Sequence, residues 1–155
     1  MSSRTIEVST QLAAAPDEIW AHTRRPDVLT YVSRGMISFT PIDPPTWPTV
    51  WAPGEHRAAM RVFGMPMGEQ VIGIEYPPPV GTTRRMRDNG RGRGIPVWDH
   101  MIEVAPEGDG TRYTDRVRIE AGLRTLLVAT FARRLYAHRQ ARWRRLVASG
   151  FDLRA

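Results

Sequence analysis

Two side chains in the second half of the sequence, His100 and Asp115, have the types and spacing that acid/base chemistry requires. Each lies in a segment of alternating apolar and polar residues, 95–104 for His100 and 111–120 for Asp115, and each falls on the apolar face. Strands joined by a short turn pair with each other, so the two Cβ atoms are expected roughly 5 to 8 Å apart. A carboxylate at that distance fixes the imidazole tautomer and raises its basicity, as a general base needs. Both are therefore candidate catalytic residues.

The same two residues also fit a purely structural role. Asp115 can serve as an internal acceptor for Tyr113, for an arginine or for a backbone N–H group, with His100 satisfied in the same network. Buried polar groups usually occur in such satisfied pairs. Loss of ligand turnover or binding in both His100→Ala and Asp115→Asn would favour the catalytic alternative, and unchanged behaviour would remove the pair from the site.

A second set of candidates lies on a predicted C-terminal helix and on a central strand. His138 and Arg142 stand one turn apart on the helix face expected to point inward, where Arg142 would bind a carboxylate or enolate oxygen of a ligand. The alternative is that they pair with an acid of the sheet, such as Asp88 or Asp99. Arg84, on the inward face of its strand, admits the same two interpretations.

The helix that carries these residues is the most strongly patterned stretch of the chain. Residues 123–149 contain no proline or glycine, and Gly150 follows where a helix end favours a residue without Cβ. Its expected buried stripe repeats at steps of three and four residues: Leu127, Phe131, Leu135, His138, Arg142 and Leu146.

The helix also holds the positive charge of the protein. It contains seven arginines and no acid, whereas the whole chain has 22 basic and 16 acidic residues and a net charge of +6. Three explanations are open: a solvated face, a docking surface for an acidic partner such as an acyl carrier protein or an anionic membrane, and a nucleic-acid site. Nucleic acid ranks last, because only Tyr136 and Trp143 are available as interleaved aromatics.

Composition excludes several classes of chemistry. The chain has no cysteine, which rules out disulfides and thiol catalysis, and all its basic residues are arginine, which rules out a Schiff-base lysine. The four histidines lack metal-ligand spacing and no phosphate-binding glycine motif is present, so neither a metal nor another cofactor is expected. The 155 residues suit a single domain spanning 1–155. Without a signal-like N-terminus or an apolar membrane span, it is expected in the cytoplasm.

The elements that must position these residues follow from the hydrophobic pattern. We predict a strand at 4–12, two short helices between 16 and 32, a strand at 36–42, and further strands at 55–63, 69–76, 82–88, 95–104 and 111–120. The segment 88–94 is expected to be a flexible turn. A proline-rich loop at 43–54 carries Trp47 and Trp51, either as a lid over an apolar opening or as ordinary packing residues. Such an α+β chain predicts a curved antiparallel sheet of about seven strands that wraps around the final helix and leaves a cavity.

Four segments carry a resemblance to a known family: APDEIW at 15–20, VWDHMIEV at 97–104, GTRYTDRVRIE at 110–120 and YAHRQARWRRL at 136–146. Together with the element order, they resemble the helix-grip superfamily, also called SRPBCC, START-like or Bet v 1-like. That group includes polyketide cyclases and aromatases, lipid carriers and other ligand-binding proteins. The resemblance covers the whole chain. It implies a helix-grip fold, and an internal cavity for a small hydrophobic, polyketide-like or aromatic molecule.

Two functions follow from the resemblance. The first is a carrier or binding protein for a hydrophobic metabolite, and the alternative is a cyclase or dehydratase in which His100 and Asp115 act as acid/base groups while Arg142 or Arg84 steadies an enolate. An interaction module that docks an acidic partner through the arginine-rich helix remains a third possibility. The side chains expected to line the ligand site are Met60, Ile72, Ile74, Tyr76, Arg84, Met86, Trp98, Tyr113, Val117, Phe131, His138 and Arg142.

Overall fold

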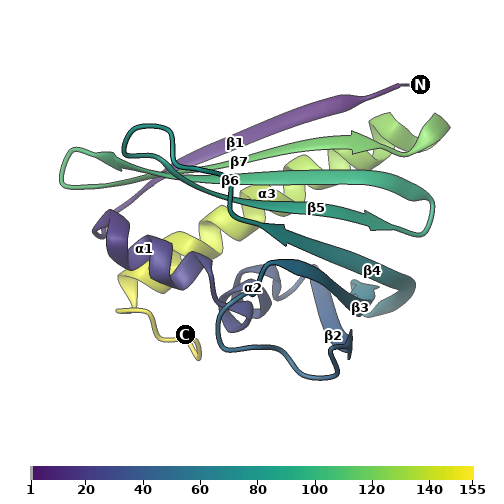
Figure 1. Cartoon of the computed structure of the whole chain (residues 1–155), viewed down its shortest axis with the longest axis horizontal. Coiled ribbons are helices and arrows are strands. Elements are labelled where there is room, and N and C mark those ends of the chain that lie inside the picture. The colour runs from purple at the N-terminus through teal and green to yellow at the C-terminus, as the bar shows by residue number, and fades with distance from the viewer. Residues whose placement is uncertain (1) are drawn as a thin grey trace.

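The computed structural model describes residues 2–155. Within them, seven antiparallel strands form one sheet in the spatial order β1-β7-β6-β5-β4-β3-β2, and three α-helices lie on one side of it (Figure 1). The strands are β1 (Arg4–Leu12), β2 (Ile37–Asp43), β3 (Gly54–Val62), β4 (Met65–Glu75), β5 (Arg84–Gly92), β6 (Ile95–Glu107) and β7 (Gly110–Glu120). The helices are α1 (Pro16–Thr23), α2 (Pro26–Ser33) and α3 (Thr125–Ala148), the last preceded by the short 3-10 turn η1 (Gly122–Arg124). The predicted fold class is confirmed.

The pairing of β6 with β7 follows the register expected from the alternating pattern. Val104 lies opposite Tyr113, and two residues further along Ile102 lies opposite Asp115. His100 is therefore the diagonal neighbour of Asp115 on the same face of the sheet. On its other side His100 lies directly opposite Asp88 of β5, so three titratable side chains stand together on neighbouring strands.

The long helix α3 ends where the sequence predicts but faces the sheet with a different stripe. Gly150 has a positive φ of 71°, and the Phe151 amide donates to the Leu146 carbonyl at 2.8 Å, which closes the helix end. The residues buried on the helix are Thr125, Ala129, Ala132, Leu135, Tyr136, Gln140, Trp143 and Leu146. The expected stripe is wrong in part, because Leu127 is 71% exposed and His138 and Arg142 are only half-buried.

The shift of the stripe has a steric cause. The helix α3 packs mainly on β1, β7 and α2, at one edge of the sheet. The small side chains of Ala129 and Ala132 let the helix approach the sheet closely there, and both are buried. The helix therefore does not cover the part of the sheet formed by β2 to β5, and a cavity remains over these strands.

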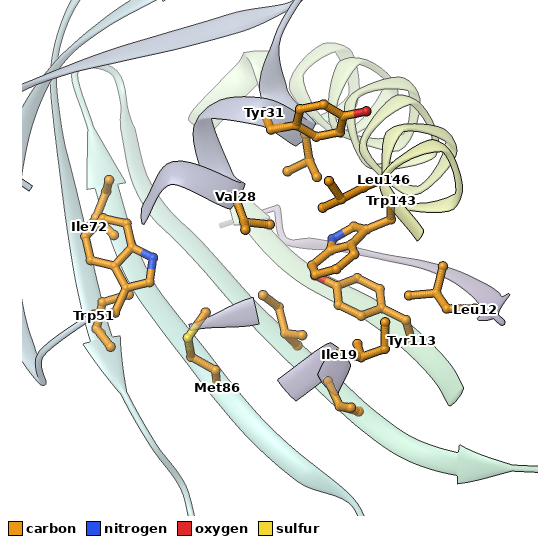
Figure 2. Close-up of a cluster of buried hydrophobic side chains, with 14 residues drawn as sticks. Leu12, Ile19, Val28, Tyr31, Trp51, Ile72, Met86, Tyr113, Trp143 and Leu146 are labelled. Atoms are coloured by element: carbon orange, nitrogen blue, oxygen red, sulfur yellow. The ribbon is translucent and has the colours of Figure 1, made fainter. Parts of the chain in front are cut away.

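A dense apolar cluster closes one end of this space. Figure 2 shows Trp143 of α3 beside Tyr113 of β7, with Leu12, Ile19 and Val28 around them. The two aromatic rings lie 5.1 Å apart between centroids. Because these side chains come from β1, β7 and all three helices, the cluster fixes α1 and α2 against the C-terminal half of α3.

Two strands are longer than the sequence predicts. The strand β4 starts at Met65 rather than at 69, because a two-residue turn at Phe63 and Gly64, both at positive φ, already reverses the chain. The strand β5 runs on to Gly92, through the stretch expected to be a flexible turn. Glycine is required inside this pairing, since a Cβ atom at Gly73 would lie 2.6 Å from the Asn89 carbonyl oxygen.

The proline-rich loop between β2 and β3 uses its tryptophans for packing. Trp51 is 3% exposed and belongs to the apolar cluster, and Trp47 packs against it with ring centroids 5.1 Å apart. The Trp51 backbone also accepts a hydrogen bond from the Tyr76 hydroxyl at 2.7 Å. Across residues 2–155, no helix is long and apolar enough to cross a membrane.

Candidate functional site: an internal cavity

The space between α3 and strands β2 to β6 is a cavity of about 310 Å³. This volume falls at the lower end of the range for small-molecule sites and corresponds to roughly ten water molecules of liquid. Most of its lining is apolar. From the sheet come Ile37, Phe39, Met60, Val62, Met67, Ile72, Ile95 and Trp98, and from α2 and α3 come Leu29, Leu127, Val128, Phe131, Leu135 and Tyr136.

The cavity opens to solvent between the β3–β4 hairpin and the beginning of α3. Met67 from the hairpin and Leu127 from the helix both line the cavity, yet they are 47% and 71% exposed. Phe63 at the hairpin tip reaches the Phe131 ring, with centroids 6.4 Å apart. Exposed apolar side chains therefore surround the opening, which gives an apolar molecule a path into the interior.

Few polar side chains reach the cavity, and two of them carry charge deep inside. These are Asp88 of β5 and Arg139 of α3. Asp88 accepts one hydrogen bond, from the Gly73 amide at 2.8 Å. Burial raises the pKa of Asp88 to about 7, although the Gly73 amide and the Arg139 charge act in the opposite direction. Asp88 is therefore a carboxyl group that gains and loses its proton near neutral pH.

Arg139 is a charged group of the cavity wall whose guanidinium has no hydrogen-bond or ion-pair partner among the described residues. Its guanidinium lies 5.0 Å from the centre of the Tyr136 ring, and its Nε atom is buried without a hydrogen-bond partner. Within residues 2–155, Arg139 forms no ion pair at 4.0 Å or less, with Asp88 or with any other acid. An arginine keeps its charge at all ordinary pH values, so the inner end of the cavity is positive whenever Asp88 is protonated.

A smaller space of about 40 Å³ continues inward from the main cavity. The two share Leu29, Ile72, Asp88 and Arg139 as lining residues, so Asp88 and Arg139 lie at their junction. The wall of the smaller space also includes His100. This volume has room for water-sized molecules but not for a larger guest.

Behind His100 lies a polar network that gives each oxygen of Asp115 a hydrogen-bond partner. The Nε2 atom of His100 lies 2.6 Å from Asp115 Oδ1, and Gln140 donates to Asp115 Oδ2 at 2.9 Å and to the Val8 carbonyl at 2.7 Å. Since a carboxylate only accepts, the proton of a neutral imidazole is on Nε2, which leaves Nδ1 as a free base. Burial lowers the pKa of His100 despite the Asp115 contact, so the imidazole is neutral at pH 7.

The structure brings about half of the predicted site residues to these two spaces. Met60, Ile72, Trp98 and Phe131 line the main cavity. Ile74, Met86, Tyr113 and His100 line the smaller one, where Ile72 also takes part. Asp115 touches His100 from behind and lines neither space.

The remaining predicted residues lie elsewhere. Tyr76 binds the Trp51 backbone, Val117 belongs to the core between β7 and α3, and Arg84 forms an ion pair with Asp17 of α1.

His138 and Arg142 dock α3 onto the end of α2. His138 Nε2 lies 2.7 Å from the Arg34 carbonyl oxygen, and Arg142 Nε donates to the Tyr31 carbonyl at 2.8 Å. The alternative, a pairing of these residues with Asp88 or Asp99, is not found: Asp88 accepts from the Gly73 amide, and Asp99 binds Arg87 at 2.8 Å.

The arginines of α3 do not form a single surface. Arg124, Arg142 and Arg144 donate to the Gly94 carbonyl, the Tyr31 carbonyl and the Thr10 hydroxyl, and Arg139 lines the cavity. Arg133, Arg134 and Arg145 are exposed. Docking of an acidic partner on this helix stays a prediction. No group of three His, Asp or Glu side chains that could hold a metal ion occurs within residues 2–155.

Sequence reasoning missed Arg139, although a signal for it exists. On α3 the cavity-lining residues Val128, Phe131, Leu135 and Arg139 recur at steps of three and four, next to the stripe that contacts the sheet. Arg139 is the single charge that continues this apolar series inward from the opening. Choosing this series over its neighbour requires knowing which edge of the sheet the helix covers.

We compared the chain with known protein families, sequences and structures. No protein-family model and no curated protein sequence matches the chain. Solved structures do: a START superfamily protein from Mycobacterium smegmatis superimposes with a TM-score of 0.66 at 14% identity, over 94% of this chain and 97% of that one.

Two further structures show the same similarity. Ara h 8.0201 gives a TM-score of 0.63 at 13% identity, over 96% of this chain and 99% of that one. Truncated norcoclaurine synthase from Thalictrum flavum gives 0.61 at 14% identity, over 94% of both. The fold predicted from the sequence resemblance is thus confirmed, and the chain adopts the helix-grip fold that it shares with these structures.

Proposed function

We propose that this protein binds a small, largely apolar molecule in the cavity between α3 and the sheet, and acts as its carrier or binding protein. The observation that carries the proposal is a cavity of about 310 Å³ with an apolar lining and an opening bordered by exposed apolar side chains. A folded protein ordinarily fills such space with its own side chains, because unfilled apolar volume is destabilising. Flat aromatic and flexible methionine side chains in the lining suit a ring-containing guest.

The proposal is tested with N-phenyl-1-naphthylamine, an uncharged aromatic probe, titrated by calorimetry. Val128 lines the cavity and Leu126, on the same helix, is 65% exposed, so Val128→Trp fills the cavity while Leu126→Trp leaves it open. We expect Val128→Trp to weaken binding by at least about 10-fold and Leu126→Trp to change it less than about twofold. Equal binding by the two variants, or no binding by the unmodified protein, would contradict the proposal.

A second candidate is acid/base catalysis on a bound poly-β-carbonyl chain, as a cyclase or dehydratase. It is favoured by the neutral His100 held by Asp115 at 2.6 Å, directly across the strand pair from Asp88, whose pKa of about 7 suits proton transfer at neutral pH. Turnover would then fall steeply in His100→Gln and depend on pH with a midpoint near 7. A carrier would instead keep its affinity for the naphthylamine probe in that variant and release the guest unchanged.

A further inference from the structure

Arg139 differs from the other unsatisfied polar groups of the interior. Within residues 2–155, five buried side-chain atoms lack a hydrogen-bond partner: Arg24 Nε, Tyr31 Oη, His56 Nδ1, Arg139 Nε and Arg142 Nη2. Of these five side chains, only Arg139 lines the cavity. A charged side chain that is partly buried and forms no hydrogen bond or ion pair is energetically costly, and proteins retain one where another group satisfies it. The missing partner of Arg139 is therefore to be sought inside the cavity.

The charges around the cavity indicate which kind of ligand group would pair with Arg139. Besides Arg139, the lining includes Arg93 and Arg124 near the opening, and Asp88 is its single acid. A guanidinium binds carboxylates and other oxyanions through its N–H donors. The positive charge and the unpaired N–H donors of the Arg139 guanidinium therefore call for a ligand with an anionic oxygen group.

We propose that the cavity takes an apolar molecule that ends in an oxyanion of the carboxylate class, with the anionic end at Arg139 and the apolar body along Phe131 toward the opening. The inference rests on the proposed function, since it assumes that the cavity is the ligand site. It names the class of ligand and the residue that distinguishes an acidic guest from a neutral one. The series Val128, Phe131, Leu135 and Arg139 on α3 gives the body and the charged end of the guest a common wall.

Asp88 makes the affinity for such a ligand depend on pH. Its neighbours are His100 and Asp99 on β6, the Gly73 amide on β4 and Arg139 on α3, with Asp115 of β7 behind His100. A charged Asp88 repels an oxyanion at Arg139, whereas its protonated form can donate a hydrogen bond to it. Since the pKa of Asp88 is about 7, oxyanion binding should weaken as the pH rises through neutrality.

Two probes that share one ring system test this. 8-Anilino-1-naphthalenesulfonate carries a sulfonate, and N-phenyl-1-naphthylamine is the same molecule without it. The sulfonate stays ionised at every pH used, so a pH effect on its binding that the naphthylamine lacks reports on protein groups. Binding of the naphthylamine tests the cavity itself, and the ratio of the two dissociation constants tests the oxyanion site.

We expect Arg139→Met to weaken sulfonate binding by about 10- to 100-fold and naphthylamine binding by less than about threefold. The matched control is Arg133→Met, which removes an exposed arginine from the same helix and should change either probe by less than about twofold. In the unmodified protein, sulfonate binding should weaken by about 3- to 10-fold between pH 6 and pH 8, and Asp88→Asn should abolish that change.

Each outcome decides between the claims. If neither probe binds, the proposed function and this inference both fail. If both bind but Arg139→Met leaves their ratio unchanged, the cavity is a ligand site and the oxyanion inference is wrong. A loss caused instead by Arg93→Met or Arg124→Met would place the anion at the opening and also overturn it. Retained naphthylamine binding shows that a variant is folded.

Discussion

Asp115 and Asp88 both lie on the inner face of the sheet, on β7 and β5, yet the protein treats their charges differently. Asp115 has a partner for each oxygen, His100 at 2.6 Å and Gln140 at 2.9 Å. Asp88 has a single hydrogen bond, from the Gly73 amide, and the nearby Arg139 is left without any partner. A satisfied buried network stabilises the fold around it, whereas an unsatisfied one beside a cavity leaves donors and acceptors for a ligand. We therefore assign Asp115 to the stability of the fold, and Asp88 and Arg139 to ligand binding.

The largest expected effect is at the satisfied acid. Asp115→Ala leaves the His100 Nε2–H and one of the two N–H donors of the Gln140 amide buried without an acceptor, so the free energy of unfolding should fall by about 3 to 5 kcal/mol. Urea unfolding followed by circular dichroism measures this. A loss below about 1 kcal/mol would mean that the network does not stabilise the fold, and the contrast with Asp88 would disappear.

Gln140→Ala tests the same Asp115 network through its partner on α3. It removes the donor shared by Asp115 and the Val8 carbonyl, which should lower the free energy of unfolding by about 2 kcal/mol. The control is Arg133→Ala on the exposed side of α3, which should have little effect. Similar losses in both variants would show that the helix, rather than the network, is being perturbed.

Asp88 should make the free energy of unfolding depend on pH. Its pKa is raised in the folded protein to about 7 by burial, so the folded state holds the proton more tightly than the unfolded chain does. Stability relative to Asp88→Asn should therefore be unaffected below about pH 4 and should fall as the pH rises toward 7. Because Asp88 keeps some accessible surface, we expect the difference in unfolding free energy between pH 5 and pH 8 to be about 1 to 2 kcal/mol. Parallel pH profiles of the two proteins would contradict this account.

The smallest expected effect on stability is at Arg139. Its side chain makes no hydrogen bond within residues 2–155, so Arg139→Met should change the free energy of unfolding by less than about 1 kcal/mol, or raise it. Thermal unfolding without ligand provides the measurement. Destabilisation by more than about 2 kcal/mol would show that Arg139 holds the fold together and is not kept for a guest.

The sequence predicted the sheet and the His100–Asp115 contact because both depend on short-range signals. Alternation and turn residues set the register of β6 and β7, and the register alone puts Asp115 diagonal to His100. The sequence did not show in the same way which face of α3 packs against the sheet. The stripe through Leu127 and His138 has the same period as the buried one, and the first half of the buried one consists mainly of threonine and alanine rather than large apolar residues.

Arg139 could not be singled out for a related reason. Seven arginines lie within 123–149, and which of them is internal depends on the edge of the sheet that α3 covers. That choice is a long-range property of the fold. The extension of β5 through Gly90 and Gly92 was missed because glycine-rich segments suggest turns, whereas here glycines permit close contact with β4.

The most direct test of the account is the NMR signal of the Arg139 Nε–H group, assigned by its absence in Arg139→Lys, during titration with the two naphthalene probes. If the Arg139 guanidinium is kept for an oxyanion, the sulfonate probe should shift this proton strongly downfield, and the uncharged naphthylamine should bind without doing so. If the proton responds equally to both probes, or to neither while both bind, Arg139 does not contact the ligand and the central claim is contradicted.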